Sequence, residues 1–181
     1  INTANAANTT ITGLTQGVYL FKFTVTDNDG GKGSDTLKVT VNAAANQAPT
    51  ANAGLDQNIT LPVNSANLNG SGTDPDGTIS IYNWTKVSGP AAGTISNSNI
   101  AITSATGLVQ GVYTFRLTVT DNAGATAFDE MKITVNAAPN QAPTANAGLD
   151  QNITLPVNQA NLTGSGTDPD GTISIYNWTK V

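Results

Sequence analysis

The sequence contains neither cysteine nor histidine among its 181 residues. Without cysteine, a disulfide framework, a thiolate metal site and a thiol nucleophile are all excluded. Without histidine, the side chain that most often serves as a general base or a metal ligand is missing. These two absences argue against most hydrolytic and transition-metal chemistry, and we therefore expect that the chain is not an enzyme.

Charge and long apolar runs are also scarce. Only 10% of the residues are charged, against roughly 25% in a typical soluble domain, so Asn, Thr, Ser and Gly must solvate the surface. The net charge of −5 argues against nucleic acid and anionic membrane as partners. No apolar run approaches the roughly 18 residues that span a bilayer, so no membrane insertion is expected. No signal peptide is recognisable, but Ile1 begins in mid-pattern, so its absence says little about localisation.

What the sequence does contain is a strong strand pattern, QGVYTFRLTVTDN, from Gln110 to Asn122. Apolar residues at every second position, with many β-branched and aromatic side chains, predict a half-buried strand. The side chains predicted to face the core are Tyr113, Phe115, Leu117 and Val119. A similar stretch, QGVYLFKFTVTDN, occurs at 16–28 with inward-facing positions Tyr19, Phe21, Phe23 and Val25. One strand used twice predicts a repeat protein.

The repeat has a period of 94 residues. Asn46–Val87 and Asn140–Val181 are identical at 40 of 42 positions, and the same offset relates 1–45 more loosely to 95–139. We therefore predict three segments. Residues 1–45 form the C-terminal half of one repeat, 46–139 form a complete repeat, and 140–181 form the N-terminal half of another.

The two half-repeats raise a question about their exposed edges. Half of a β domain leaves unpaired strand edges and an open apolar face, which invites pairing with another chain. Between the two halves, only the counterpart of the loop 88–94 is absent. Two explanations stay open: the sequence is an arbitrary window on a longer array, or the tail of one copy completes the head of another.

The complete repeat predicts about seven short strands. Those that the pattern marks are at 51–52 with 58–61, at 66–70, at 79–87, around 100–102, within 110–122 and at 126–135. Turn signals occur every 8 to 12 residues and no helical period is present, which is typical of an all-β, immunoglobulin-like sandwich. Trp84 is predicted to fill the core, as is its counterpart Trp178, and Tyr113 stands where a tyrosine corner is expected.

Two adjoining motifs carry a family resemblance. The run GTDPDGTISIYNWTKVSGP, followed by GVYTFRLTVTDNAG, resembles a PKD (polycystic kidney disease) domain repeat of the subtype with W-x-K-V-S-G-P. The resemblance covers essentially the whole chain and implies an extracellular or cell-surface, non-catalytic role. Similar repeats occur in large secreted proteins of Bacteroidetes, often exported by type IX secretion. There they form stalks of adhesins or spacers beside polysaccharide-degrading domains.

The DPDG motif at 74–77, repeated at 168–171, is the strongest candidate site. In an immunoglobulin-like sandwich its loop shares a pole with the loop after the penultimate strand and with the preceding linker. Calcium binds about six to eight oxygen ligands, and the resemblance adds that some PKD domains bind calcium there. The predicted ligands are Asp74, Asp76, Asp121, Asn46 and Asn52, with Asp27, Asp168 and Asp170 in the half-repeats. The alternative is a tight turn without metal.

Two functions remain open. In the first, the array is a mechanical stalk or spacer whose partners are neighbouring repeats and, end to end, other copies that build fibres. In the second, each repeat is a carbohydrate-binding accessory module of a secreted polysaccharide-degrading enzyme. The second function needs exposed aromatic side chains, and only 6% of residues are aromatic, most of them assigned to cores.

Overall fold

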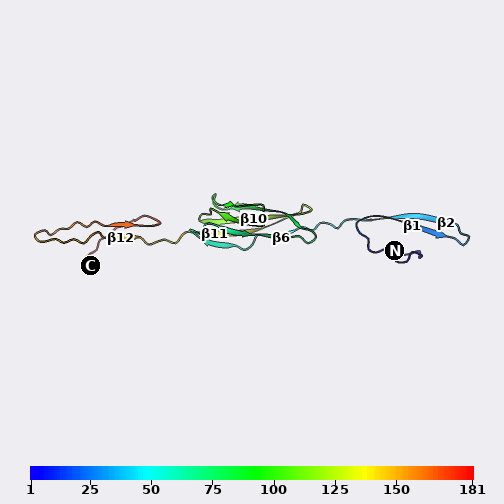
Figure 1. The fold of residues 1–181 in the computed structure, drawn as a ribbon, viewed down its shortest axis with the longest axis horizontal. Coiled ribbons are helices and arrows are strands. Elements are labelled where there is room, and N and C mark those ends of the chain that lie inside the picture. Colours follow the sequence, from blue (N-terminus) through cyan, green and yellow to red (C-terminus); the bar gives the residue numbers. More distant parts are fainter. The chain divides into compact units, whose positions relative to one another are not determined.

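The computed structural model describes all residues from Ile1 to Val181. The chain divides into two compact units, Ile1–Gln47 and Ala48–Val181, which we describe separately. Every regular element is a β-strand, and the ribbon contains no coil of helix (Figure 1). Accordingly, no helix of this chain has the length and apolar character that a membrane crossing requires.

The first unit contains one β-hairpin, formed by β1 (Gly17–Thr26) and β2 (Lys32–Val41). The two strands pair antiparallel from Gly17 opposite Val41 to Thr26 opposite Lys32. The inward positions predicted for Phe23 and Val25 are wrong for this unit, because the two side chains are 52% and 53% exposed. They alternate as expected, but the unit has no second sheet to cover them.

The complete repeat forms an immunoglobulin-like sandwich of nine strands. One layer is a four-stranded sheet in the order β4-β11-β10-β7, and the other combines β5-β9-β8 with the pair β3-β6. The strands of the first layer are β4 (Gln57–Thr60), β7 (Ile79–Ser88), β10 (Gly111–Asp121) and β11 (Thr126–Asn136). Those of the second are β3 (Thr50–Asn52), β5 (Ala66–Asn69), β6 (Ser71–Thr73), β8 (Thr94–Ile95) and β9 (Ile102–Thr106).

The core lies between these two layers. Period-two alternation in β10 turns every second side chain inward, as the pleat requires. The buried side chains of the four-stranded sheet include Trp84, Tyr113, Phe115, Leu117, Val119, Met131, Ile133 and Val135. Leu68 and Ala105 face them from the second layer. The all-β, immunoglobulin-like prediction is confirmed.

The strand boundaries differ from the prediction at three places. The first strand is two strands, β3 and β4, which join different sheets on either side of Gly54. Gly54 has a φ of +88°, a conformation that favours glycine. The second strand is likewise interrupted at Gly70, between β5 and β6, and β8 was not predicted. These breaks depend on which distant strand each segment pairs with, and a local pattern does not encode that pairing.

Residues 140–181 contain only one short ladder, β12 (Thr144–Asn146) with β13 (Ser165–Thr167). The counterparts of β4, β5 and β7 are not strands here. Trp178, predicted to be a core residue, is 49% exposed. The reason is that residues 140–181 contain no counterpart of β9, β10 or β11, which help to enclose Trp84 in the complete repeat.

Candidate functional site

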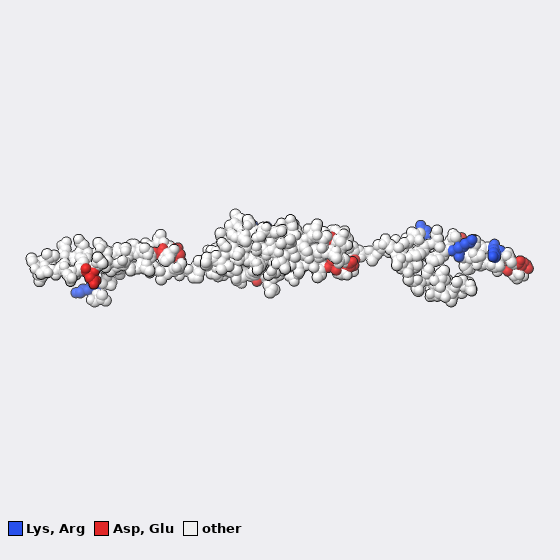
Figure 2. Space-filling view, in the orientation of Figure 1, with Lys and Arg blue, Asp and Glu red and all other residues white.

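The candidate site is the acidic pole of the complete repeat, which we define as Asp74, Asp76, Asp121 and Asn122. The loop after β6 supplies the first two residues, and the end of β10 supplies the others. The two loops are joined by a pair of hydrogen bonds. The Thr78 N–H donates to Asn122 Oδ1 at 2.8 Å, and the Asn122 N–H donates to the Thr78 carbonyl at 3.0 Å. Acidic side chains gather at this end of the central body in Figure 2, while most of the visible surface is uncharged.

Gly77 allows the two loops to approach each other. A Cβ atom at this position would lie 2.5 Å from Asp74 Oδ2 and would collide with Asn122 Oδ1. Both oxygens therefore crowd the same point beside the glycine. Any larger residue would have to push the two loops apart.

Asp74 is the residue of the pole with a perturbed acidity. Its Oδ1 accepts a 3.4 Å hydrogen bond from the Asp76 N–H, but its Oδ2 is buried with no hydrogen-bond partner. The pKa of Asp74 is raised above its ordinary value of 3.8, chiefly because burial disfavours the charged form. The Asp76 and Asp121 carboxylates raise this pKa further, and the Asp76 N–H opposes them.

Asp121 has a structural task in the turn between β10 and β11. The side chain is only 2% exposed. Its Oδ1 accepts hydrogen bonds of 2.8 Å from the N–H groups of both Ala123 and Ala125. Asp27 does the same in the first unit, where its Oδ1 accepts from the N–H groups of Asp29 and Gly31. This carboxylate therefore closes the hairpin turn in both copies.

The remaining predicted ligands are not assembled at the pole. Asn52 pairs opposite Ser71, two residues from the acidic loop, and its Oδ1 accepts a 2.8 Å bond from the Gly54 N–H. Asn46 belongs to the first compact unit, whereas the pole residues belong to the second. No group of three or more acidic side chains that could hold a metal ion exists in the chain.

In the half-repeats the counterparts of the pole residues belong to different compact units. Asp168 and Asp170 lie in the second compact unit, whereas Asp27 lies in the first. Asp168 Oδ1 accepts a 3.4 Å bond from the Asp170 N–H, and Asp170 Oδ2 accepts a 3.0 Å bond from the Gln141 N–H. Each half therefore holds one part of the arrangement found in the complete repeat.

At the opposite pole, Lys86 fixes the loop between β7 and β8, and Tyr113 fixes the segment between β9 and β10. Lys86 Nζ donates to the four successive carbonyls of residues 90–93 at 3.0 to 3.3 Å. The sequence analysis missed this role, although the lysine lies two residues before the loop 88–94. Tyr113 is fully buried, and its hydroxyl accepts from the Val109 N–H at 3.0 Å and donates to the Val109 carbonyl at 3.2 Å. The contact is that of a tyrosine corner.

Two packed β layers, a sealed aromatic core and repeated hairpins define the class: a tandem immunoglobulin-like β-sandwich protein. The chain belongs to the family described as K319L-like, PKD domain. The family model matches residues 1–41, 53–135 and 147–181, well over half of the chain.

Several mammalian proteins are similar in sequence. The chain is 39% identical over 167 residues to the mouse dyslexia-associated protein KIAA0319 homolog, covering 92% of this chain and 15% of that protein. It is 35% identical over 170 residues to human dyslexia-associated protein KIAA0319, covering 94% of this chain and 16% of that protein. The chain thus spans about a sixth of these relatives' length. They give no support to the bacterial origin that the resemblance implied.

Solved PKD domains are also similar to part of the chain. The solution structure of the PKD domain from KIAA 1837 protein has a TM-score of 0.48 at 32% identity and covers 55% of this chain and 98% of that one. The PKD domain of human KIAA0319 has a TM-score of 0.44 at 24% identity and covers 59% and 90%.

Proposed function

We propose that this chain is a non-catalytic spacer segment of an extracellular or cell-surface protein. The single observation that supports the proposal is the path of the chain through the complete repeat. Thr50 lies opposite Thr73, beside the acidic pole, and β11 ends at Asn136, beside Thr60. Since β11 runs away from the acidic pole for 11 residues, the chain enters and leaves about 35 Å apart. Each repeat therefore advances the chain by roughly its own length, as a spacer must.

The core chemistry of the repeat is consistent with a non-catalytic role. Asp121 is the charged side chain buried in the complete repeat, and it holds turn amides. The rest of the buried set is apolar apart from Thr103. The PKD family membership supports this proposal, and the extracellular location rests on the same resemblance. We leave the Bacteroidetes origin and type IX secretion out of the proposal, because no reported relative supports them.

Single-molecule pulling tests the spacer role. We expect the complete repeat to unfold in one cooperative event that releases about 300 Å, since its roughly 90 residues extend by up to about 3.6 Å each from a folded length of about 35 Å. Smooth extension without that event would contradict the proposal, because a spacer must hold its length under load.

Within the complete repeat, the alternative function, carbohydrate binding, has no specific observation in its favour. Trp84, Tyr113 and Phe115 are buried. Phe128 is exposed, but the Arg116 guanidinium lies 4.2 Å from the centre of its ring, and Arg116 is held by Glu130 at 2.6 Å. Binding of the chain to a polysaccharide array would reverse this ranking.

We also propose, as a subsidiary point, that calcium binds at the acidic pole. The support is the unpartnered Oδ2 of Asp74, whose pKa the Asp76 and Asp121 carboxylates raise; no ready-made group of three such side chains exists, but a cation would offset their mutual repulsion. The expected result is a higher melting temperature of the complete repeat with calcium than with chelator. An unchanged melting temperature would mean that the acidic pole forms a turn and does not bind calcium.

A further inference from the structure

The chain passes from one sheet of the complete repeat to the other between β3 and β4. We call residues 53–56 the crossing segment, because β3 belongs to the second layer and β4 to the first. No strand ladder includes this stretch: the pairing of β3 ends at Asn52, and that of β4 begins at Gln57. Contacts other than a ladder must therefore attach the crossing segment to the sandwich.

Two carboxylates make this attachment, and both join the crossing segment to β11. Asp129 Oδ2, on β11, accepts a 2.8 Å hydrogen bond from the Ala53 N–H. Asp56 Oδ1, in the crossing segment, accepts a 2.8 Å hydrogen bond from the Lys132 N–H of β11. Ala53 is fully buried, so water cannot replace the partner of its N–H. Both bonds have a charged acceptor, which makes them stronger than bonds between neutral groups.

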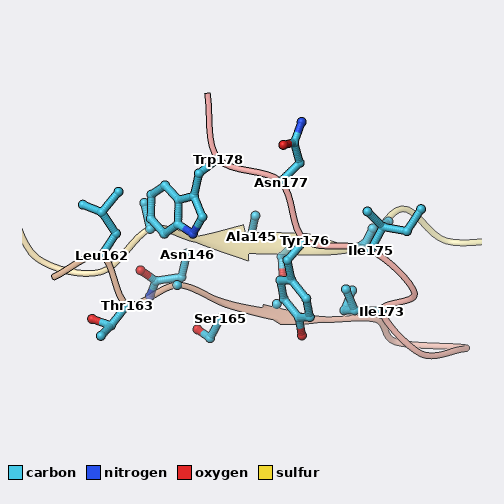
Figure 3. Close-up of a pocket in the computed structure, with 15 residues that line it drawn as sticks. Ala145, Asn146, Leu162, Thr163, Ser165, Ile173, Ile175, Tyr176, Asn177 and Trp178 are labelled. Carbon is cyan, nitrogen blue, oxygen red and sulfur yellow. The ribbon is translucent and has the colours of Figure 1, made fainter. Parts of the chain in front are cut away.

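The shape of the crossing segment is set by a local turn. Asn52 Oδ1 accepts a 2.8 Å bond from the Gly54 N–H, and Gly54 has a φ of +88°. The same turn occurs one period later, where Asn146 Oδ1 accepts a 2.7 Å bond from the Gly148 N–H. In Figure 3 Asn146 lies at the end of β12, the counterpart of β3. Since the turn has its own local bond, the contribution of the two carboxylates is attachment to β11.

The direction of the strands determines how these bonds respond to a pulling force. β4 is parallel to β11, whereas the other ladders of the complete repeat are antiparallel. Both strands begin on the side of the acidic pole and run away from it. Because the chain enters beside the acidic pole and leaves at the end of β11, opposite pulls on its two ends slide β4 along β11. The bonds between the two segments are then strained together, and none opens ahead of the others.

We propose that Asp56 and Asp129 fasten the crossing segment to β11 and thereby set the force at which the complete repeat unfolds. The β4–β11 ladder acts beside them, but it covers β11 only from Ile133 to Asn136. The two carboxylates extend the attachment toward the acidic pole, to a part of β11 that β4 does not reach. This inference rests on the proposed spacer role and names the residues that resist the load.

Both carboxylates recur at the period of the repeat. Asp35, in β2, is the counterpart of Asp129, although residues 1–45 match 95–139 only loosely. Asp150 is the counterpart of Asp56. The two aspartates therefore belong to the repeating unit and are not particular to one copy.

Pulling on the 181-residue chain at constant force tests the proposal. Ala48→Cys and Ala137→Cys supply anchors at the two poles, because the chain contains no cysteine and both positions are exposed. In this anchored chain, Asp129→Ala should raise the unfolding rate at a given force by roughly tenfold, the order expected for losing a hydrogen bond to a charged group. Asp56→Ala should act in the same direction. Asp129→Asn keeps an acceptor oxygen, so it should give a smaller increase and should fold even if Asp129→Ala does not.

Two controls separate this attachment from general stability. Glu130→Ala changes the neighbouring residue and removes the 2.6 Å contact with Arg116, which joins β11 to β10 and not to the crossing segment. It should alter the unfolding rate by less than about twofold, as expected for an exposed ion pair. The second control replaces the Ala137→Cys anchor by Ala123→Cys, so that both anchors lie at the acidic pole. The bonds then open one after another, and the parent chain should unfold at a lower force.

The parent chain tests the spacer role separately, because it must show the single unfolding event of about 300 Å. If that event occurs but all three aspartate variants unfold at the parent's rate, the proposal for Asp56 and Asp129 is wrong and the spacer role stands. If the event is absent, both are wrong. Equal unfolding forces with the two pairs of anchors would also overturn the proposal, because the direction of the strands would then have no effect.

Discussion

Trp84 and Trp178 occupy the same position in segments that are identical at 40 of 42 residues, yet one is 1% exposed and the other 49%. The local sequence therefore does not decide the burial. What differs is the set of strands around the indole: Trp84 has β10 beside it in the same sheet and β5 and β9 in the facing layer, whereas residues 140–181 contain no counterpart of β9, β10 or β11. The hydrophobic core of this fold therefore forms only when both layers are present.

The same comparison can be made for the hairpins. Phe115 and Leu117 are fully buried in β10, whereas Phe23 in β1 is 52% exposed. Both hairpins nevertheless keep the same ladder and the same aspartate-closed turn. Turn chemistry and alternation thus suffice to form the hairpin, and the opposite layer decides whether its apolar side is hidden.

The largest difference in stability between the two regions should appear when each tryptophan is replaced separately by alanine. Trp84→Ala leaves a cavity in a packed core and should lower the free energy of unfolding of the complete repeat by about 3–5 kcal/mol. Trp178→Ala should change it by no more than about 0.5 kcal/mol. Urea denaturation followed by far-UV circular dichroism measures both. Equal losses would show that the two sites are not packed differently.

A smaller contrast is expected at the paired glycines. A Cβ at Gly70 would lie 2.6 Å from Leu117 and 2.8 Å from the Ala101 carbonyl, whereas at Gly164 the nearest atom is Trp178 Cζ2 at 3.0 Å. Gly70→Ala should therefore cost about 1–3 kcal/mol by overpacking. Gly164→Ala should cost little, because the exposed Trp178 can move. The same urea titration reports both, and a neutral Gly70→Ala would mean that the two layers are looser than described.

The tyrosine corner gives the next effect. Tyr113→Phe removes the hydroxyl that bonds both backbone groups of Val109 and should destabilise the complete repeat by about 1–2 kcal/mol. Tyr19→Phe removes the equivalent bonds to Thr15 in the uncovered hairpin, so the unfolding of the complete repeat should not change. Hydrogen exchange of the Val109 amide should quicken in the first variant alone.

The smallest effect concerns charge at the acidic pole. Because the pKa of Asp74 is raised in the folded chain above 3.8, the folded state binds this proton more tightly than the unfolded state does. The contribution of Asp74 to stability therefore improves as the pH falls from neutral through the folded pKa, and it levels off below 3.8. Asp74→Asn should melt higher than the parent at pH 7, and the difference should shrink toward pH 4.

Asp74→Asn also tests whether calcium binds at the acidic pole. In chelator, Asp74→Asn should raise the melting temperature for the reason above, but it should also abolish any rise that calcium produces in the parent chain. A calcium effect that survives Asp74→Asn would place the cation elsewhere. If the difference in melting temperature between Asp74→Asn and the parent chain is the same at pH 4 and pH 7, the raised pKa of Asp74 is contradicted.

The sequence alone predicted much of this fold for a definite reason. The alternation in Gly111–Asp121 and the Asp-Asn-Ala-Gly turn are local signals, and the long strands β7, β10 and β11 lie close to where those signals placed them. The split between β3 and β4 and the short β8 depend on distant partners and were missed. Trp178 failed as a core residue for the same reason, since its cover lies outside its own half-repeat.

The candidate site, too, could be predicted from the local sequence only in part. The DPDG motif marked the acidic loop, and the pole does bring Asp74 near Asp121. Asn52 was misplaced because its side chain closes a turn at Gly54, and that choice depends on the break between two sheets. The role of Lys86 required knowing that the following loop folds back over the lysine.

Hydrogen exchange of the parent chain tests the central claim most directly. The amides of β10 and β11 should be strongly protected, whereas those of β1, β2 and 173–181 should exchange quickly. Protection of β1 and β2 that is equal to that of β10 and β11 would contradict the account.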